Sequence, residues 1–168
     1  MASRLQRELK TNKPFASLEH EAFLNVLRTA SALQEALHVL FKPYGISQAQ
    51  YNVLRILRGA SPPGLPCKEI GERMVTRVPD VTRLLDRLEA RKLVLRERDT
   101  NDRRVVLARI TPEGRALIDE LDGPIRQIHL RQLSHLGQDK LEQLIVLLEE
   151  ARDTPANNEP RQFPQCPD

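Results

Sequence analysis

The sequence predicts a mainly α-helical domain that carries one small antiparallel β-hairpin. Three observations lead to this fold class. Apolar residues recur at three- and four-residue steps over most of the chain, as they do in amphipathic helices. Two short stretches, at 94–98 and 105–110, instead alternate apolar and polar residues or are rich in β-branched ones, as strands are. Proline and glycine residues fall between many of these segments and mark their ends.

The composition limits the class of protein. The chain has 168 residues, enough for one core, and no apolar run approaches the roughly 20 residues that a transmembrane helix needs. Met1–Lys13 lacks the apolar core of a secretory signal. We therefore expect a cytoplasmic protein. Residues 1–17 are expected to form an N-terminal extension, and residues 153–168, with several prolines, a disordered tail.

Metal, cofactor and catalytic sites are not expected. Two cysteines, Cys67 and Cys166, do not support a multi-cysteine zinc site or a disulfide framework. No two histidines have the i, i+4 spacing of a helical metal site. They are His20, His38, His129 and His135. The chain also lacks a glycine-rich phosphate loop and a nucleophile elbow, which disfavours an enzyme such as a cysteine hydrolase.

The first long helix is expected at about 18–42, where Pro43 ends it. Its apolar residues are Phe23, Leu27, Ala30, Leu33, Leu37, Leu40 and Phe41. A second helix begins after Ser47, an N-cap residue that has Gln50 in the reciprocal capping-box position.

Two shorter helices follow. The third is expected at about 67–74, and the fourth has Thr76 as its N-cap and Pro79 in its first turn, where a missing N–H costs little. The apolar stripe of the fourth helix consists of Val81, Leu84, Leu85 and Leu88. This spacing leaves the other faces of the helix to Thr82, Arg83, Asp86 and Arg87.

A hairpin then precedes the last two helices. Its two strands are joined by Asp99–Arg104, a polar, turn-forming segment. Thr111 and Pro112 open a fifth helix as N-cap and first residue, and the pair Gly123-Pro124 predicts a kink or break near its middle. The sixth helix is expected at about 138–152.

This order of elements fits a winged helix-turn-helix domain that binds duplex DNA. The third and fourth helices are short and adjacent, so the fourth can enter a major groove while the hairpin forms a two-stranded β wing. The net charge of +3 and the pI of about 9.1 suit a polyanionic partner. Basic residues gather in the middle third of the chain, at Arg73, Arg77, Arg83, Arg87, Arg91, Lys92, Arg96, Arg98, Arg103 and Arg104.

The fourth helix carries the first group of candidate DNA contacts. Arg83 and Arg87 lie one turn apart, where a guanidinium can form two hydrogen bonds to guanine, and Thr82 can contact a thymine methyl or a phosphate. The alternative is an ordinary solvated helix face on which Asp86 pairs with Arg83 or Arg87.

The hairpin tip carries the second group. Asn101, Asp102, Arg103 and Arg104 place two adjacent guanidiniums on a turn, where they have little packing use but can reach a minor groove or phosphates. The alternative here is a merely solvated turn.

Two motifs resemble the MarR family of transcriptional regulators. Asp102–Thr111 (DRRVVLARIT), followed by Pro112-Glu113-Gly114, is similar to that family's D-x-R, β-strand and L-T-x-x-G signature. Val81–Glu89 (VTRLLDRLE) is similar to its recognition helix. In element order, the resemblance covers residues 18–152.

The resemblance implies a homodimer with a winged helix-turn-helix at about 46–112 and dimerisation helices at about 18–42 and 112–152. The apolar faces of these flanking helices agree with an association surface, the alternative being an ordinary buried core. The resemblance also implies that Arg104 lies in a minor groove and that Asp102 orients the wing arginines. The candidate DNA-binding residues are Thr76, Arg77, Thr82, Arg83, Asp86, Arg87, Asp102, Arg103 and Arg104.

Two features depart from the family pattern. Lys92 stands after the recognition helix where a glycine is common; a left-handed residue would cost lysine more than glycine, so we expect a differently shaped turn. The reactive cysteine that peroxide-sensing members carry near the start of the first long helix is absent, and Cys67 is either another thiol sensor or an ordinary helix-start residue.

The leading hypothesis is a nucleoid-associated, dimeric repressor of a palindromic operator, with an activator as the alternative. Its ligand, by resemblance an amphipathic and often aromatic acid, would bind between the dimer helices and the winged domain, with Arg28 as a candidate carboxylate partner or simply a surface ion-pair residue. The alternative is a winged-helix module that binds protein and reads no bases.

Overall fold

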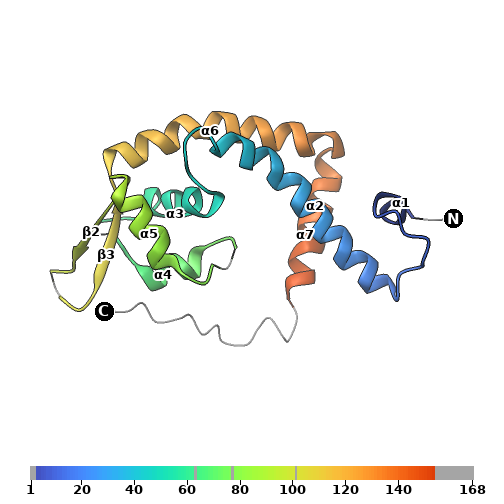
Figure 1. Cartoon of the computed structure of the whole chain (residues 1–168), viewed down its shortest axis with the longest axis horizontal. Helices are drawn as coiled ribbons and strands as arrows, with labels where there is room; N and C mark the ends of the chain where they lie inside the picture. The colour runs from blue at the N-terminus through green and yellow to red at the C-terminus, as the bar shows by residue number, and fades with distance from the viewer. Residues whose placement is uncertain (1–2, 63, 77, 101, 154–168) are drawn as a thin grey trace.

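The computed structural model in Figure 1 describes residues 3–62, 64–76, 78–100 and 102–153. Its helices are α1 (Arg4–Glu8), α2 (Leu18–Phe41), α3 (Gln48–Arg58), α4 (Cys67–Arg73), α5 (Val81–Ala90), α6 (Pro112–Leu133) and α7 (Gln138–Arg152), with a 3-10 turn at Ser134–Leu136. The strands are β1 (Leu65–Pro66), β2 (Val94–Arg98) and β3 (Val106–Ile110). The expected tail, apart from Asp153, lies outside the described residues.

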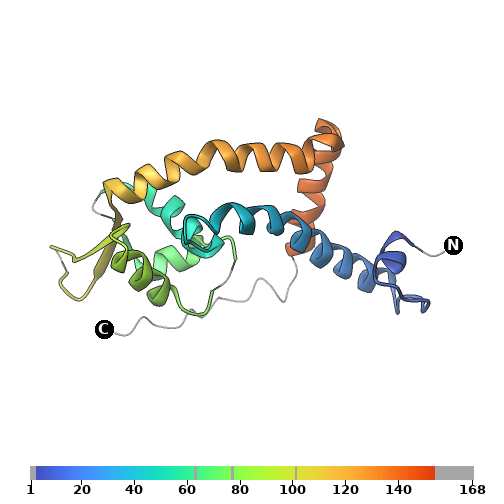
Figure 2. The same ribbon diagram turned by 45° about the horizontal axis from the view of Figure 1, so that its top comes forward.

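The prediction of a mainly helical chain with a winged helix-turn-helix is confirmed. Helices α3, α4 and α5 and the sheet form one end of the described molecule, which we call the winged unit (residues 46–110). Helices α2 and α6 lead away from it, α7 follows at the far end of α6, and α1 lies at the opposite end of the molecule, beside the start of α2 (Figures 1 and 2). None of the described helices is both long enough and apolar enough to cross a bilayer.

The sheet has one strand more than the sequence predicted. Strand order is β1-β3-β2, and both pairings are antiparallel, with Leu65 opposite Ala108 and Arg96 opposite the same residue on the other side. Strand β1 is only two residues long, too short to display an alternating pattern. The wing is therefore the predicted β2–β3 hairpin, with the short strand β1 paired to β3 as a third strand.

The hydrophobic core lies inside the winged unit and continues under the first half of α6. Its largest fully buried side chains are Phe41, Leu54, Ile70, Leu85, Leu88, Ile118, Leu121, Val53 and Val94. They come from α2, α3, α4, α5, β2 and α6, so one cluster joins the recognition helix to the helices on both sides of it. Truncating one such Leu or Ile to alanine costs about 2–5 kcal/mol in general.

Residues 1–17, predicted only as an extension, contain the short helix α1. Ser3 caps it with a capping box completed by Gln6, and Leu5 is buried to 3% exposure. Glu8 of α1 forms an ion pair with Arg28 of α2 at 3.7 Å. The Ser-x-x-Gln spacing is the sequence signal for this helix.

Helix α6 runs without a break through Pro124, so the break allowed for at Gly123-Pro124 does not occur. Proline removes one backbone donor from the helix ladder, at a typical cost of about 3 kcal/mol. Leu121, Ile125 and Ile128 are buried on one face of the helix across this position, and their burial offsets that cost.

The turn after α5 also differs from expectation. Lys92 does adopt the left-handed conformation, with φ of 58°, that glycine would take more easily. Two contacts hold it there: the Leu93 N–H donates to the carbonyl of Leu88 at 3.0 Å, and the Lys92 carbonyl accepts from the Thr111 hydroxyl at 2.7 Å. These bonds offset the strain of roughly 1–2 kcal/mol that an L-residue has in this region.

The predicted start of α6 at Thr111 is confirmed, and the structure explains the glycine that follows. Thr111 accepts the Gly114 N–H at 3.0 Å, and its own N–H donates to the Leu93 carbonyl at 3.1 Å. A Cβ on Gly114 would lie 2.2 Å from that carbonyl oxygen. The Thr-x-x-Gly spacing therefore joins the wing to α6.

Candidate nucleic-acid interface

The recognition helix α5 begins later than predicted. Its N-cap is Asp80, whose Oδ1 accepts the Arg83 N–H at 2.9 Å, and the prediction of Thr76 as the cap is wrong. Pro79 disfavours a helical conformation for the residue before it, so the helix cannot extend back through Val78. Thr76 instead lies exposed in the segment between α4 and α5.

The outer face of α5 carries the predicted polar residues. Leu85 and Leu88 are buried, whereas Arg83, Asp86 and Arg87 are exposed. The Arg83 side chain is held at its base by Asp80, with Nε 3.0 Å from Oδ2, and remains 79% exposed. A helix with its apolar face fixed in the core and two arginines on its outer face can enter a major groove.

The remaining candidates near α5 are placed less uniformly. Thr82 is half-buried, with its hydroxyl 3.6 Å from the Cys67 sulfur at the start of α4. Arg77 lies outside the described residues. The hypothesis that Asp86 pairs with Arg83 or Arg87 is wrong, because its ion-pair partner is Arg96 of β2.

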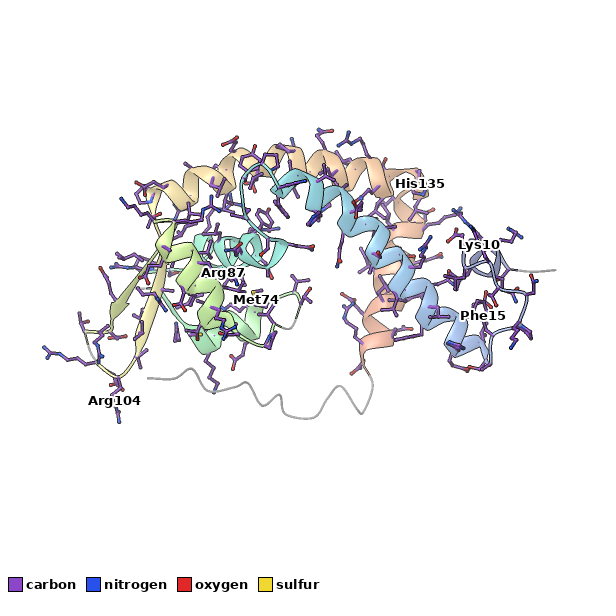
Figure 3. All side chains as sticks on the ribbon, viewed as in Figure 1. Lys10, Phe15, Met74, Arg87, Arg104 and His135 are labelled. Atoms are coloured by element: carbon purple, nitrogen blue, oxygen red, sulfur yellow. The ribbon has the colours of Figure 1, made fainter. Side chains whose placement is uncertain are left out.

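At the wing tip, Arg104 points away from the body of the protein (Figure 3). Its side chain is 89% exposed, and Asp102 holds it by three hydrogen bonds, one from the backbone N–H at 3.0 Å and two from the guanidinium at 3.1 Å. The Arg104 guanidinium lowers the pKa of the Asp102 carboxyl below its usual value. The tip is thus an oriented cation beside an ionised carboxylate.

Arg103 and Asn101 are the other predicted residues of the wing tip. Arg103 is exposed, and its carbonyl accepts from the Arg98 guanidinium at 2.9 Å. Asn101 lies outside the described residues. Because a minor groove concentrates negative potential, a projecting guanidinium at such a tip suits insertion there.

Sequence reasoning missed a cluster that joins α5 to the wing. The Arg96 guanidinium of β2 contacts Glu89 at 2.6 Å and Asp86 at 2.7 Å, both on α5. It lowers the pKa of the Glu89 carboxyl below its usual value. A left-handed turn separates these partners in sequence, so helical spacing alone gave no signal for the pairing.

A second cluster, also missed, ties the winged unit to α6. Arg58, at the end of α3, forms ion pairs with Asp119 at 2.8 Å and Asp122 at 2.7 Å. Hydrogen bonding from Arg58 lowers the pKa of Asp122. Nearby, the Tyr44 hydroxyl donates to Glu120 at 2.8 Å. The orientation of the winged unit on α6 is therefore set by ion pairs and a hydrogen bond as well as by the hydrophobic core.

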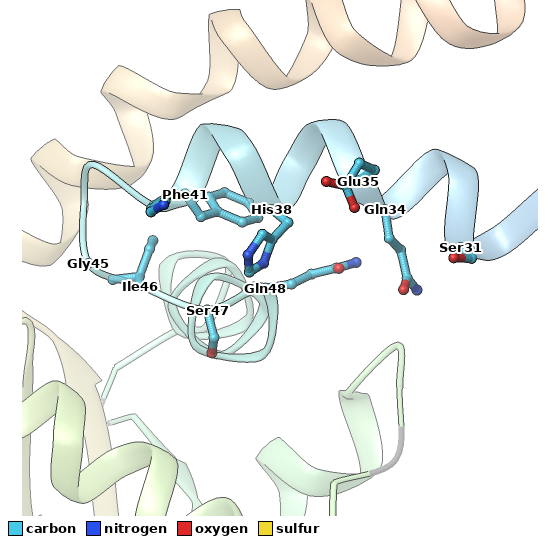
Figure 4. A pocket seen from close by; sticks show the side chains of 10 residues that line it. Ser31, Gln34, Glu35, His38, Phe41, Gly45, Ile46, Ser47 and Gln48 are labelled. Atoms are coloured by element: carbon cyan, nitrogen blue, oxygen red, sulfur yellow. The ribbon is translucent and has the colours of Figure 1, made fainter.

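Two cavities border the junction of α2 and the winged unit. One, of about 500 Å³, lies between α2 and the start of α3 and is lined by polar side chains such as His38, Glu35 and Gln48 (Figure 4). The other, of about 430 Å³, lies between α2, α3, α6 and the segment that leads into α5. Its lining residues are Gln34, Leu37, Phe41, Gln48, Ala49, Tyr51, Asn52, Arg55, Met74, Val75, Thr76, Val78, Ile125 and His129. Arg28, the candidate carboxylate partner, lines neither cavity and faces Glu8.

Comparison with known proteins agrees with this geometry. The family model for the MarR family matches residues 46–106. The HTH-type transcriptional regulator YkoM of Bacillus subtilis is 34% identical over 111 residues, which are 66% of this chain and 70% of YkoM. The homoprotocatechuate degradative operon repressor of Escherichia coli is 28% identical over 142 residues, 80% of this chain and 95% of the repressor.

Solved structures give the same result. A MarR transcription factor from Planctomyces limnophilus is 42% identical, with a TM-score of 0.62, over 82% of this chain and 99% of that one. The PcaV transcriptional regulator of Streptomyces coelicolor, solved with its natural ligand, is 27% identical, with a TM-score of 0.67, over 84% of this chain and 99% of PcaV. These similar proteins are transcription regulators.

Proposed function

Because this chain belongs to the MarR family of DNA-binding transcriptional regulators, we propose that it represses transcription by binding a palindromic operator as a homodimer. The observation that carries this proposal is the pairing of two exposed arginines on α5 with an oriented arginine at the wing tip. Helix α5 enters the major groove, and Arg104 enters the adjacent minor groove. The protein acts in the cytoplasm, on the nucleoid.

The DNA contacts divide into two kinds. Arg83, at the exposed start of α5, reads a guanine edge, and Arg104 reads minor-groove width. The remaining basic and hydroxyl candidates hold the phosphates on either side and set the register of the helix; they are Thr76, Arg77, Thr82, Arg87 and Arg103. Asp102 fixes the direction of Arg104 through its three hydrogen bonds.

The dimer forms through the ends of the molecule remote from the wing. Helices α2, α6 and α7 expose large apolar side chains there, between 47% and 80% exposed: Leu18, Phe23, Val26, Leu27, Leu130, Ile145, Val146 and Leu147. Apolar side chains in such number on a soluble monomer usually mark an association surface. A twofold pair would cover the same surface on both subunits and hold the two α5 helices at a fixed separation.

The cavity of about 430 Å³ binds the regulating ligand. Leu37, Phe41 and Ile125 give it an apolar floor, and the exposed side chains of Arg55 and His129 line its wall, which suits an aromatic or amphipathic acid. Arg55 is a better candidate than Arg28 for the carboxylate partner, because Arg28 already pairs with Glu8. The name of the E. coli relative, which represses an operon for homoprotocatechuate degradation, agrees with a ligand of this class.

The position of this cavity couples it to DNA binding. The Asn52 side chain in its wall accepts a hydrogen bond from the Val75 N–H at 2.9 Å, and Val75 belongs to the segment that leads into α5. A ligand that separates Asn52 from this segment moves the start of α5. It releases DNA only to the extent that it binds better to the displaced arrangement than to the DNA-bound one.

The test of this function is binding to the protein's own promoter region at several salt concentrations. The wild-type affinity should fall steeply as salt rises, because phosphate contacts release counterions. Arg104→Ala should weaken binding, whereas Arg152→Ala, far away at the end of α7, serves as the matched charge control and should not. Binding that is insensitive to salt and to Arg104→Ala would instead favour a winged-helix module for protein partners.

A further inference from the structure

An acidic residue stands in the middle of the surface that faces DNA in the proposed complex. Asp86 lies on the exposed face of α5 with Arg83 one turn before it and Arg87 beside it, and its side chain is 52% exposed. Phosphates repel a carboxylate at this position, so Asp86 weakens general attraction to DNA. An exposed arginine on this surface is explained by its attraction to phosphates, but an exposed aspartate is not.

Arg96 holds Asp86 in one orientation. Its Nη2 lies 2.7 Å from Asp86 Oδ1 and 2.6 Å from Glu89 Oε2, and its Nε donates to Glu89 Oε2 at 2.8 Å. Among the described residues, no second ion-pair partner is found for Asp86, and its side chain stays 52% exposed. One oxygen of Asp86 is therefore fixed by an ion pair, and the other is available at the helix surface.

The base of this arrangement is rigid. Strand β2 lies at the edge of the sheet, and the backbone N–H of Arg96 on that open edge donates to Glu89 Oε1 at 3.1 Å. Glu89 thus binds both the main chain and the side chain of Arg96, and the Arg96 side chain is only 26% exposed. Arg96 is consequently not available to reach a phosphate, unlike the arginines of the α5 surface.

We infer that Asp86 is a specificity-determining residue that accepts a hydrogen bond from the exocyclic amine of a cytosine in the major groove, with Arg96 as its positioning residue. This assignment rests on the proposed entry of α5 into that groove. Cytosine presents an N4 amine donor, whereas guanine presents two acceptors that repel a carboxylate. Thymine presents an acceptor and a methyl group, and the adenine amine lies next to the N7 acceptor. An oriented carboxylate therefore rejects three bases and accepts one.

The experiment is selection from a randomised duplex DNA library with the full chain and its variants, followed by affinity measurements on single-base changes of the selected site. The wild type should select a cytosine in each half-site. Replacing this cytosine with another base should lower the affinity roughly 5- to 150-fold. Asp86→Ala should lose the preference at this base pair alone. Asp86→Asn should change the preferred base to adenine, because an amide can both donate and accept.

Variants at Arg96 test the positioning role. Arg96→Lys keeps the charge but cannot contact both carboxylates with a planar fork, so it should weaken the cytosine preference at the same base pair. Combined with Asp86→Ala, it should cause no further loss of preference there. The matched charge control is Glu150→Gln, which removes an exposed acid at the far end of α7 and should leave the selected sequence unchanged.

Two results would overturn the assignment. One is an Asp86→Ala variant that selects the same sequence as the wild type; another is an equal loss of affinity on every sequence, which would make Asp86 a purely structural partner of Arg96. Should the wild type select no sequence at all, the proposed DNA-binding function itself fails. In that case there is no base preference to compare between the wild type and the variants, so failure of the DNA-binding function is distinguishable from failure of the Asp86 assignment.

Discussion

Replacing Lys92 with glycine should stabilise the protein, although the change removes a whole side chain. Lys92 has φ of 58° in the turn between α5 and β2. An L-residue in this region carries a strain of roughly 1–2 kcal/mol, which glycine lacks. Glycine also gives the unfolded chain more freedom, which costs about 0.5–1 kcal/mol. The difference predicts a gain of about 0.5–1 kcal/mol in the free energy of unfolding per chain.

The control for this prediction is Lys92→Ala, which removes the exposed side chain but keeps the strained backbone. Both variants retain the Lys92 carbonyl that accepts from Thr111, so the junction with α6 is unchanged. Urea unfolding followed by circular dichroism, at one fixed protein concentration, measures the differences. If Lys92→Gly is no more stable than Lys92→Ala, the left-handed turn is not strained and the reasoning is refuted.

Three further substitutions test other parts of the structure. Gly114→Ala should destabilise by about 1–3 kcal/mol in thermal or urea unfolding, because its Cβ would meet the Leu93 carbonyl; a stabilised variant would contradict this junction. The ion pair with Arg58 lowers the pKa of the Asp122 carboxyl in the folded protein. An exposed pair of this kind stabilises the fold by about 0.2–1 kcal/mol. This stabilisation is present above the unfolded pKa of Asp, about 4, and is lost as the pH falls through the lower, folded pKa. Asp122→Asn should therefore flatten the acid side of a stability–pH curve, and an unchanged slope would count against the pair. Leu27→Asp should shift the protein from dimer to monomer in analytical ultracentrifugation, whereas an intact dimer would remove α2 from the interface.

Much of the fold could be predicted because its helices are long and their apolar spacing is regular. The start of α3 at Ser47 and that of α6 at Thr111 were both found from N-cap residues. The same signal failed at α5, where Thr76 and Asp80 are both good caps on either side of Pro79. Strand β1 and helix α1 were missed because both are too short for a periodic pattern to develop.

The candidate site was only partly accessible from sequence. The resemblance to the family's wing indicated that Asp102 orients the arginines. Asp102 and Arg104 are only two positions apart in sequence, so Asp102 can bond Arg104 directly. Contacts between distant segments left no such trace. Arg96 reaches back across a turn to α5, and Arg55 lines a cavity whose walls come from four separate segments. From the sequence, Arg28 could be named only as a candidate for the ligand or as a surface ion-pair residue, and Asp86 only as a partner for a neighbour within α5.

The most direct test of the account is hydroxyl-radical footprinting of the full-length protein on its own promoter region. A homodimer that inserts two α5 helices should protect two symmetric sites about one helical turn, roughly 10 base pairs, apart. Minor-groove protection by the two wings should flank them and disappear with Arg104→Ala. A single asymmetric site, or no protection at concentrations where the protein is dimeric, would contradict the account.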